Sequence, residues 1–160
     1  MYFDTNYSYG LKWSSNLIYS VTTEAIDTRV RQKIKQILPC DVLKPENPFD
    51  PNDFEPGYFD CIVSSICLDT ACPDKENLQT IIKKLGTYVR SAGQMTLGVG
   101  LQSTFYEFRG VKFPLISLHS TEVEAFMREA GFVNVKSEIE TVPAPGCDAS
   151  GIMVATGIKK

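Results

Sequence analysis

Two adjacent serines, Ser64 and Ser65, interrupt an apolar run in the stretch YFDCIVSSICLDTACPD, residues 58–74. The run from Phe59 to Leu68 is predicted to be a strand, and its apolar character is typical of a strand covered on both faces of a parallel α/β sheet. Ligands of such sheets bind outside the carboxyl ends of the strands. A serine hydroxyl can both donate and accept a hydrogen bond. We therefore expect the two serines to face a binding crevice.

Other polar residues are expected to have structural roles. Asp69 and Asp74 follow the strand, and we expect them to cap the next helix and the turn before it rather than to form an acid–base pair. His119 is the only histidine in the sequence, and we expect it to lie on the surface or to cap a helix. No residue is therefore assigned a catalytic role.

The five cysteines are scattered along the chain without a C-x-x-C pair, at positions 40, 61, 67, 72 and 147. This spacing argues against a disulfide framework and against a zinc site. Free thiols persist in a reducing compartment, so a cytoplasmic location is expected.

Length and charge limit the possible partners. One domain over residues 1–160 is expected, and the net charge is −3 at pH 7, so no basic field attracts nucleic acid. The basic stretch RVRQKIKQ, residues 29–36, has apolar residues at helical spacing and is interpreted as the solvated face of a helix. No signal peptide or membrane-spanning run is recognised. We expect neither a nucleic acid nor a membrane partner.

Hydrophobic periodicity predicts alternating helices and strands. The helices are predicted at residues 23–38, 74–90 and 121–130, the last opened by a capping box of Thr121 and Glu124. The strands are predicted at residues 40–43, 59–68, 94–101, 133–142 and 152–158, the last running antiparallel. Four prolines and a glycine make residues 44–57 a proline-rich loop. This order predicts an α/β fold, the second half of a doubly wound sheet: mostly parallel and ending in an antiparallel hairpin.

Several segments resemble one enzyme family. They are CLDTACPD, LGTYVRSAGQ, STFYEFRGVKF and EVEAFMREAGF, with KWSSNLIYSV and VRQKIKQILPCDV upstream. From about Trp13 to Lys160 the chain resembles the C-terminal half of the small-molecule methyltransferases that include the nicotinamide, phenylethanolamine, indolethylamine and thioether enzymes. The resemblance implies a partial Rossmann-like class I methyltransferase fold with its first strands missing. It also implies S-adenosylmethionine as cofactor and methyl transfer to the nitrogen or sulfur of a small molecule.

The resemblance also implies a cofactor site. Asp41 and Val42 would lie beside the adenine, where a carboxylate can accept from the exocyclic amino group and a backbone N–H can donate to a ring nitrogen. Ser65 matches a position near the cofactor. The alternatives are that Asp41 only caps the following turn and that Ser65 is a buried, satisfied hydroxyl.

On the acceptor side, Tyr106 matches an aromatic residue that stacks on substrate in the nicotinamide enzyme, and Phe105 beside it keeps the aromatic character. Val99 stands where that enzyme has an aspartate, and Leu115 where it has a serine. These departures favour a less polar amine, a pyridine-like ring or a thioether as acceptor. The alternative for Tyr106 and Phe108 is an aromatic cover over the sheet.

Two elements of such an enzyme are not found. The sequence has no glycine-rich turn after a first strand and no acidic residue closing a second strand, and Gly98-Val99-Gly100 is not that turn because no helix follows it. We expect a truncated chain with impaired activity, in which the strand CIVSSICL exposes an edge that can pair with another chain. The alternative is a non-catalytic fragment acting as an interaction module, or a degenerate copy.

Overall fold

The computed structural model describes residues 22–44, 48–50, 53–141 and 146–160. The chain divides into two compact units, residues 1–38 and 39–160. No helix within the described ranges is long and apolar enough to cross a membrane. The expectation of a single domain over residues 1–160 stays a prediction.

The first unit contains helix α1 (Thr23–Lys33), whose N-terminus is capped by Thr22: the Thr22 hydroxyl accepts from the Ala25 N–H at 3.2 Å. The predicted extension to residue 38 is wrong, because Ile34 is already extended. Ile34 and Ile37 are 52% and 88% exposed, so a further turn would bury little apolar surface. Pro39 also disfavours helical geometry at the residue before it.

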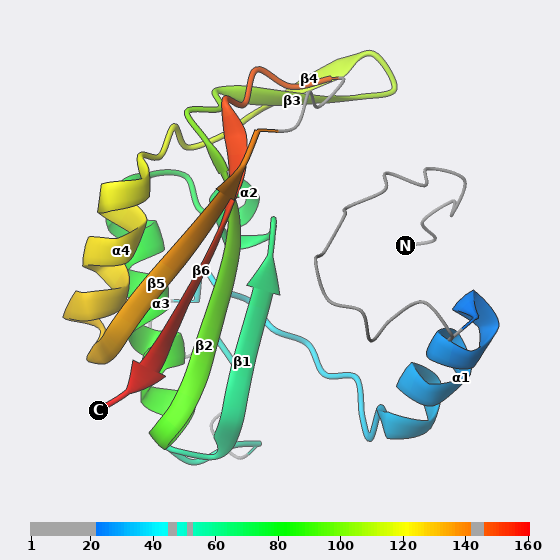
Figure 1. Cartoon of the computed structure of the whole chain (residues 1–160), viewed down its shortest axis with the longest axis vertical. Coiled ribbons are helices and arrows are strands. Elements are labelled where there is room, and N and C mark those ends of the chain that lie inside the picture. Colours follow the sequence, from blue (N-terminus) through cyan, green and yellow to red (C-terminus); the bar gives the residue numbers. More distant parts are fainter. Residues whose placement is uncertain (1–21, 45–47, 51–52, 142–145) are drawn as a thin grey trace. The chain divides into compact units, whose positions relative to one another are not determined.

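The second unit is built on a four-stranded sheet (Figure 1). Its strands, in spatial order, are β1 (Phe59–Ser65), β2 (Val89–Leu101), β6 (Gly151–Lys159) and β5 (Phe132–Glu140). β1 and β2 are parallel, whereas β6 runs antiparallel to both of its neighbours. The predicted α/β class and the antiparallel hairpin at its end are confirmed.

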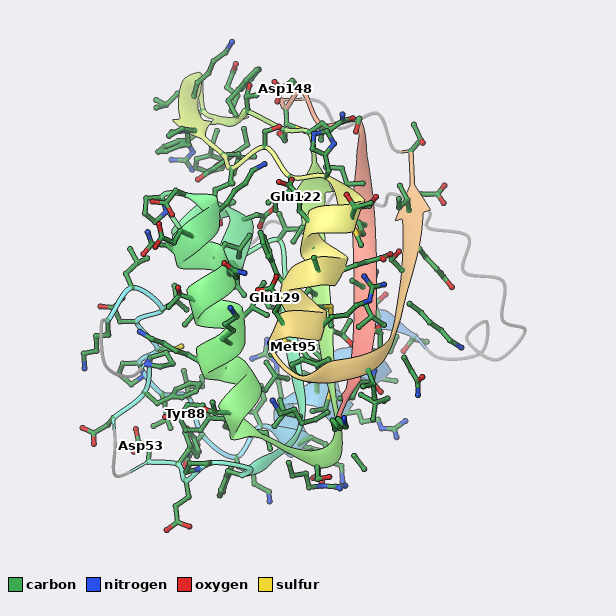
Figure 2. The ribbon with its side chains drawn as sticks, turned by 90° about the vertical axis from the view of Figure 1, so that its left-hand side faces the viewer. Asp53, Tyr88, Met95, Glu122, Glu129 and Asp148 are labelled. Atoms are coloured by element: carbon green, nitrogen blue, oxygen red, sulfur yellow. The ribbon has the colours of Figure 1, made fainter. Side chains whose placement is uncertain are left out.

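Two helices cover one face of the sheet (Figure 1). They are α3 (Lys75–Tyr88) and α4 (Ser120–Glu129). Apolar side chains of both helices and of the central strands form the core, which includes Leu78, Ile81, Met95, Leu97, Leu118, Met127, Phe132 and Met153. The two helices are also joined by an ion pair of Lys75 with Glu122 at 2.7 Å and by one of Lys83 with Glu129 at 3.1 Å. Figure 2 shows both glutamates on α4.

The other face of β1 is open. Cys61 and Ser65 are exposed, and Val63 is 67% exposed. The prediction that this strand is covered on both faces is wrong for the described residues. The strand also ends at Ser65, because Ile66 takes a positive φ of 47°. The predicted continuation to Leu68 is instead the start of a short helix, α2 (Leu68–Ala71).

Two further boundaries differ from the predictions. β2 begins at Val89 instead of residue 94, because Val89 already pairs with Phe59, and residues 90–93 of β2 form an irregularity opposite Asp60 of β1. The capping box of α4 is not formed by residues 121 and 124. The helix begins two residues earlier than expected from that box, with His119 as N-cap and the Glu122 carboxylate accepting from the His119 N–H at 2.8 Å. The expected capping position of His119 is thus observed.

A two-stranded hairpin follows β2, made of β3 (Phe105–Phe108) and β4 (Val111–Pro114). In Figure 1 it lies beyond the carboxyl end of β2. Sequence patterning left this segment without an assigned element.

Candidate functional site

The carboxyl ends of β1 and β2 lie side by side and bring Ser65 next to Gly98. The Ile66 N–H donates to the Gly98 carbonyl oxygen at 2.8 Å. A Cβ on Gly98 would lie 3.3 Å from Ser65 Oγ, so the glycine leaves room for the hydroxyl. Ser65 is exposed, which excludes the alternative of a buried hydroxyl.

Ser64 and Ser65 do not share a face, because successive side chains of a strand alternate. Ser64 pairs with Leu97, which is 2% exposed in the helix-covered core. The expectation that both serines face one crevice is therefore wrong for Ser64, and Ser65 alone is on the open face.

The segment CDVL, residues 40–43, is a turn and not the predicted strand. Asp41 Oδ1 accepts from the Leu43 N–H at 3.0 Å, and the Asp41 carbonyl oxygen accepts from the Lys44 N–H at 3.2 Å. Aspartate favours such turns because its side chain competes for backbone N–H groups. The capping alternative for Asp41 is thus observed, and contact of Asp41 and Val42 with an adenine stays a prediction.

Cys40 and Val42 lie on either side of Asp41 in this segment. Burial raises the pKa of the Cys40 thiol, and the charges of Cys67 and Asp41 raise it further. Cys67 follows β1 directly and precedes α2. Val42 is half-buried and packs against the core. That the Asp41 turn and Ser65 share one cofactor site stays a prediction.

Asp69 has a role that sequence patterning missed. Its side chain is 2% exposed, and Oδ2 accepts from the Gly100 N–H at 2.9 Å, which ties the short helix α2 to the end of β2. Among the described residues Oδ1 has no hydrogen-bond partner. Burial raises the pKa of the Asp69 carboxyl, and the Gly100 N–H opposes part of the rise. Asp74, in contrast, caps α3 as predicted: its Oδ1 accepts from the Asn77 N–H at 2.8 Å.

The hairpin carries the predicted acceptor-side residues. The ring of Tyr106 stacks on Phe113 with centroids 5.0 Å apart, and Lys112 Nζ lies 4.1 Å from the centroid of Phe105. Phe105 and Tyr106 are half-buried, whereas Phe108 is 60% exposed. The aromatic side chains of the hairpin thus lie on an element beyond the carboxyl end of β2 (Figure 1).

The two departures from the nicotinamide enzyme have different surroundings. Val99 is 3% exposed and pairs with Met153 in the core, so a carboxylate at this position would be buried among apolar groups. Leu115 is half-buried and its N–H donates to the Thr104 carbonyl oxygen at 2.9 Å.

Asp148 is the second residue missed in the sequence, and Figure 2 shows it at the hairpin end of the molecule. Its Oδ1 accepts from the Thr104 N–H at 2.7 Å, from the Ser103 hydroxyl at 3.0 Å and from the Phe105 N–H at 3.3 Å. Its Oδ2 accepts from the Thr104 hydroxyl at 2.5 Å. No spacing rule predicts this cluster, because the partners lie 43–45 residues away in the sequence.

Two further kinds of site were considered, a metal site and a pocket. Within the described ranges no group of His, Cys, Asp and Glu residues is arranged to hold a metal ion. A hollow of about 550 Å³ lies over the paired strands β5 and β6 and is lined by Asn134, Val135, Lys136, Thr156, Gly157 and Ile158. Because Thr156 and Ile158 pair with Thr96 and Gln94, this hollow is not at the carboxyl end of β2.

Comparison with known proteins identifies the family. The sequence model of the NNMT/PNMT/TEMT family matches residues 11–160. The chain belongs to this family. It is 33% identical to nicotinamide N-methyltransferase from Homo sapiens over 106 residues, which are 66% of this chain and 39% of the relative. It is 26% identical to phenylethanolamine N-methyltransferase from Mus musculus over 133 residues, which are 81% of this chain and 45% of the relative.

Solved structures share the fold. A SAM-dependent methyltransferase from Methanosarcina mazei is 14% identical with a TM-score of 0.56, covering 67% of this chain and 62% of its own. The 1,6-didemethyltoxoflavin-N1-methyltransferase of Burkholderia thailandensis is 18% identical with a TM-score of 0.56. The match covers 88% of this chain and 58% of the Burkholderia chain. The family member described here spans less than half the length of the curated relatives given above. Its sheet is that of the class I methyltransferase fold.

Proposed function

We propose that this chain takes part in S-adenosylmethionine-dependent methyl transfer to the nitrogen of a small molecule. The family match over residues 11–160 carries the proposal. When bound, the cofactor supplies a methyl group already activated on a sulfonium sulfur. The protein then has mainly to bind and align the partners, an effect that can lower a barrier by about 7–11 kcal/mol. This agrees with the lack of an assigned acid or base.

The groups at the ends of β1 and β2 fit the adenosine part of such a cofactor. Ser65 offers an exposed hydroxyl above Gly98, and Val42 of the Asp41 turn packs against the core. In the proposal the Asp41 carboxylate and the Val42 backbone orient the adenine, while Ser65 contacts the cofactor near the strand end. Hydroxyl, carboxylate and amide are the donors and acceptors that a nucleoside requires.

The proposed acceptor is small and weakly polar. Phe105 and Tyr106 of the hairpin would contact it, and aromatic faces favour a cationic sulfonium or a cationic product. The apolar side chains of Val99 and Leu115 favour an amine or a pyridine-like ring over a carboxamide, and a thioether is the sulfur-containing alternative. That the partners include neither nucleic acid nor membrane, and that the chain is cytoplasmic, remain predictions.

Calorimetric titration of the purified chain with S-adenosylhomocysteine tests the proposal, with a circular dichroism melt of each variant alongside. Ser65→Ala should weaken binding by about threefold to tenfold, the effect of one hydrogen bond. Ser64→Ala is the matched control and should leave affinity unchanged, because its side chain is on the other face of β1. Absence of micromolar binding to a cooperatively folded parent chain would contradict the proposal.

A second candidate, an interaction module, is favoured by the edge of β1. Because the Ile66 N–H points to β2, the alternating backbone groups of Cys61, Val63 and Ser65 point away from it. Within the described residues β1 pairs with β2 alone, and it contains neither Lys nor Pro to protect the edge. Antiparallel pairing with β1 of a second copy would place Val63 opposite Val63 and Cys61 opposite Ser65, with no like charges facing each other.

Sedimentation equilibrium distinguishes this candidate. A dimer that Val63→Lys dissociates would favour it, with Val111→Lys as the control because Val111 is a similarly exposed strand valine at 54%. A parent chain that stays monomeric at every concentration would exclude pairing between copies.

A further inference from the structure

The β3–β4 hairpin depends on contacts at its base. Each of its strands has four residues, and an isolated two-stranded hairpin is at best marginally stable in water. Phe108 and Val111 near its tip are 60% and 54% exposed, so the tip gains little from burial. Its position relative to the end of β2 must therefore be set where the chain enters and leaves it.

Asp148 forms the densest set of contacts at this base. The carboxylate accepts from two consecutive backbone N–H groups, those of Thr104 and Phe105, and from the hydroxyls of Ser103 and Thr104. Ser103 is 1% exposed, so its hydroxyl is held within the fold. These contacts fix the backbone immediately before and at the start of β3.

Gly146 and Cys147, which precede Asp148, also contact β3. The Glu107 N–H donates to the Gly146 carbonyl oxygen at 2.5 Å, and Tyr106 forms a β-bridge with Cys147. The segment before β6 thus lies along β3, with Asp148 at its end. A displacement of Asp148 would move the backbone of Phe105 and Tyr106 together.

The negative charge of Asp148 is stabilised by the groups of Ser103, Thr104 and Phe105 that donate to it. The Thr104 hydroxyl, then its N–H, and the Ser103 and Phe105 groups lower the pKa of the Asp148 carboxyl, so it is ionised at neutral pH. Four donors occupy most of the lone pairs that a carboxylate offers. Hydrogen bonds to an ionised acceptor are about twice as strong as neutral ones. Asp148 therefore acts on the hairpin and has little capacity left for a ligand.

We propose that Asp148 is the positioning residue of the acceptor side: it sets the β3–β4 hairpin at the end of β2 and thereby places Phe105 and Tyr106. The functional part rests on the proposed methyl transfer, in which these two rings contact the acceptor. No step of the chemistry passes through Asp148 itself.

Amide hydrogen exchange followed by NMR tests the positioning directly. In Asp148→Ala the amides of Thr104, Phe105 and Glu107 should exchange on the order of 10- to 100-fold faster, whereas those in β2 should not change. Asp148→Asn should be intermediate, because its amide oxygen still accepts but carries no charge. Glu107→Gln removes a charge from the same hairpin and should leave all these rates unaltered.

A double-mutant cycle isolates the main contact. Thr104→Val removes the hydroxyl that donates to Asp148 Oδ2 while keeping the side-chain shape. If the two residues act through each other, the effects of Asp148→Ala and Thr104→Val on the exchange rates should be clearly less than additive. Additive effects would show that Asp148 acts elsewhere.

The kinetic test compares the effect of the substitution on the acceptor KM with its effect on the affinity for S-adenosylhomocysteine. With an accepted small amine, Asp148→Ala should raise the acceptor KM by about tenfold while the affinity for S-adenosylhomocysteine stays within about twofold. Unchanged exchange at Thr104 and Phe105, or equal acceleration throughout β2, would overturn the proposal, as would an equal loss of both affinities. If the parent chain methylates no acceptor, the proposed function fails, and the local exchange rates still decide whether Asp148 holds the hairpin.

Discussion

Asp69 is a carboxylate whose surroundings oppose its charge. Burial raises its pKa, and one of its oxygens has no hydrogen-bond partner among the described residues. A group whose pKa is higher in the folded than in the unfolded chain favours folding while it is protonated. Its contribution is complete below the unfolded pKa of ~3.9 and is lost as the pH rises through the raised pKa.

We predict that Asp69→Asn removes this part of the pH dependence. The free energy of unfolding of the parent should fall relative to that of the variant as the pH rises from about 4 towards neutrality. Urea titrations of both proteins across this range measure the difference. Glu122 and Asp148 have lowered pKa values, so they contribute to the pH dependence with the opposite sign. Their contributions are the same in both proteins and cancel when one curve is subtracted from the other. Parallel curves would mean that Asp69 ionises in the fold as readily as in the unfolded chain.

The thiol of Cys72 should be unreactive. Burial, followed by the charges of Asp74, Cys67 and Asp69, raises its pKa to about 11, and its side chain is 5% exposed. Since the thiolate is the reactive species, iodoacetamide at pH 7.5 should alkylate the exposed Cys61 and Cys67 well before Cys72. Peptide mass spectrometry over time measures the order. Alkylation of Cys72 at the rate of Cys67 in the folded protein would contradict the assignment.

Sequence patterns located most apolar positions and missed the polar contacts between distant segments. The α3 face of Leu78, Ile81 and Leu85 is buried as its periodicity predicts. The partners of Asp69 and Asp148 lie 31 and 43–45 residues away, and no local rule connects them. The sequence PGCDASG predicts a polar turn. It does not indicate which hydroxyl or N–H group will donate to the carboxylate of Asp148.

At the scale of elements, β1 leaves little space beside Gly98 near the carboxyl end of β2. A methyl group there would lie 3.3 Å from Ser65 Oγ and 3.4 Å from Ser65 Cα, whereas one at Gly100 would meet Ser103 and Asp69 at 3.7 and 3.8 Å. Replacing either glycine by Ala reduces the entropy of the unfolded chain equally. The difference in the free energy of unfolding between the two variants therefore measures the steric crowding at Gly98.

We predict that Gly98→Ala lowers the free energy of unfolding by about 1 kcal/mol more than Gly100→Ala does. Gly98→Ala should also weaken binding of S-adenosylhomocysteine, because it displaces the Ser65 hydroxyl. Thermal melts and calorimetric titrations of the two variants give both quantities. Equal stability of the two proteins would mean that β1 shifts without cost.

The element boundaries were harder to predict than the elements. Ser91-Ala92-Gly93 has the composition of a helix stop, yet these residues continue β2, with Ala92 at a positive φ of 60° and Gly93 packed against the Asp60 backbone. The capping box predicted for Thr121 and Glu124 is wrong because Glu122 forms the capping interaction instead. Its carboxylate binds both the His119 N–H and Lys75 of α3, and the second contact is tertiary.

At the scale of the whole molecule, stability should be unevenly distributed. α1 has 11 residues and none is buried, and helices this short are marginal in water without tertiary packing. The centre of β2 is almost fully buried. We predict that deuterium exchange, followed by mass spectrometry, is fast throughout α1 and slowest in the β2 and β6 peptides. Protection of α1 equal to that of β2 would show that its apolar stripe is covered in solution.

The place of β6 in the sheet has a consequence for biosynthesis. β6 lies between β2 and β5, yet it is translated after both of them. While the ribosome makes the preceding residues, β2 and β5 have no central strand to join them, and the backbone groups along their facing edges have no partner strand. The nascent polypeptide must therefore remain without its complete sheet until residues 151–159 leave the exit tunnel, and a chaperone that binds apolar strands would act during this interval.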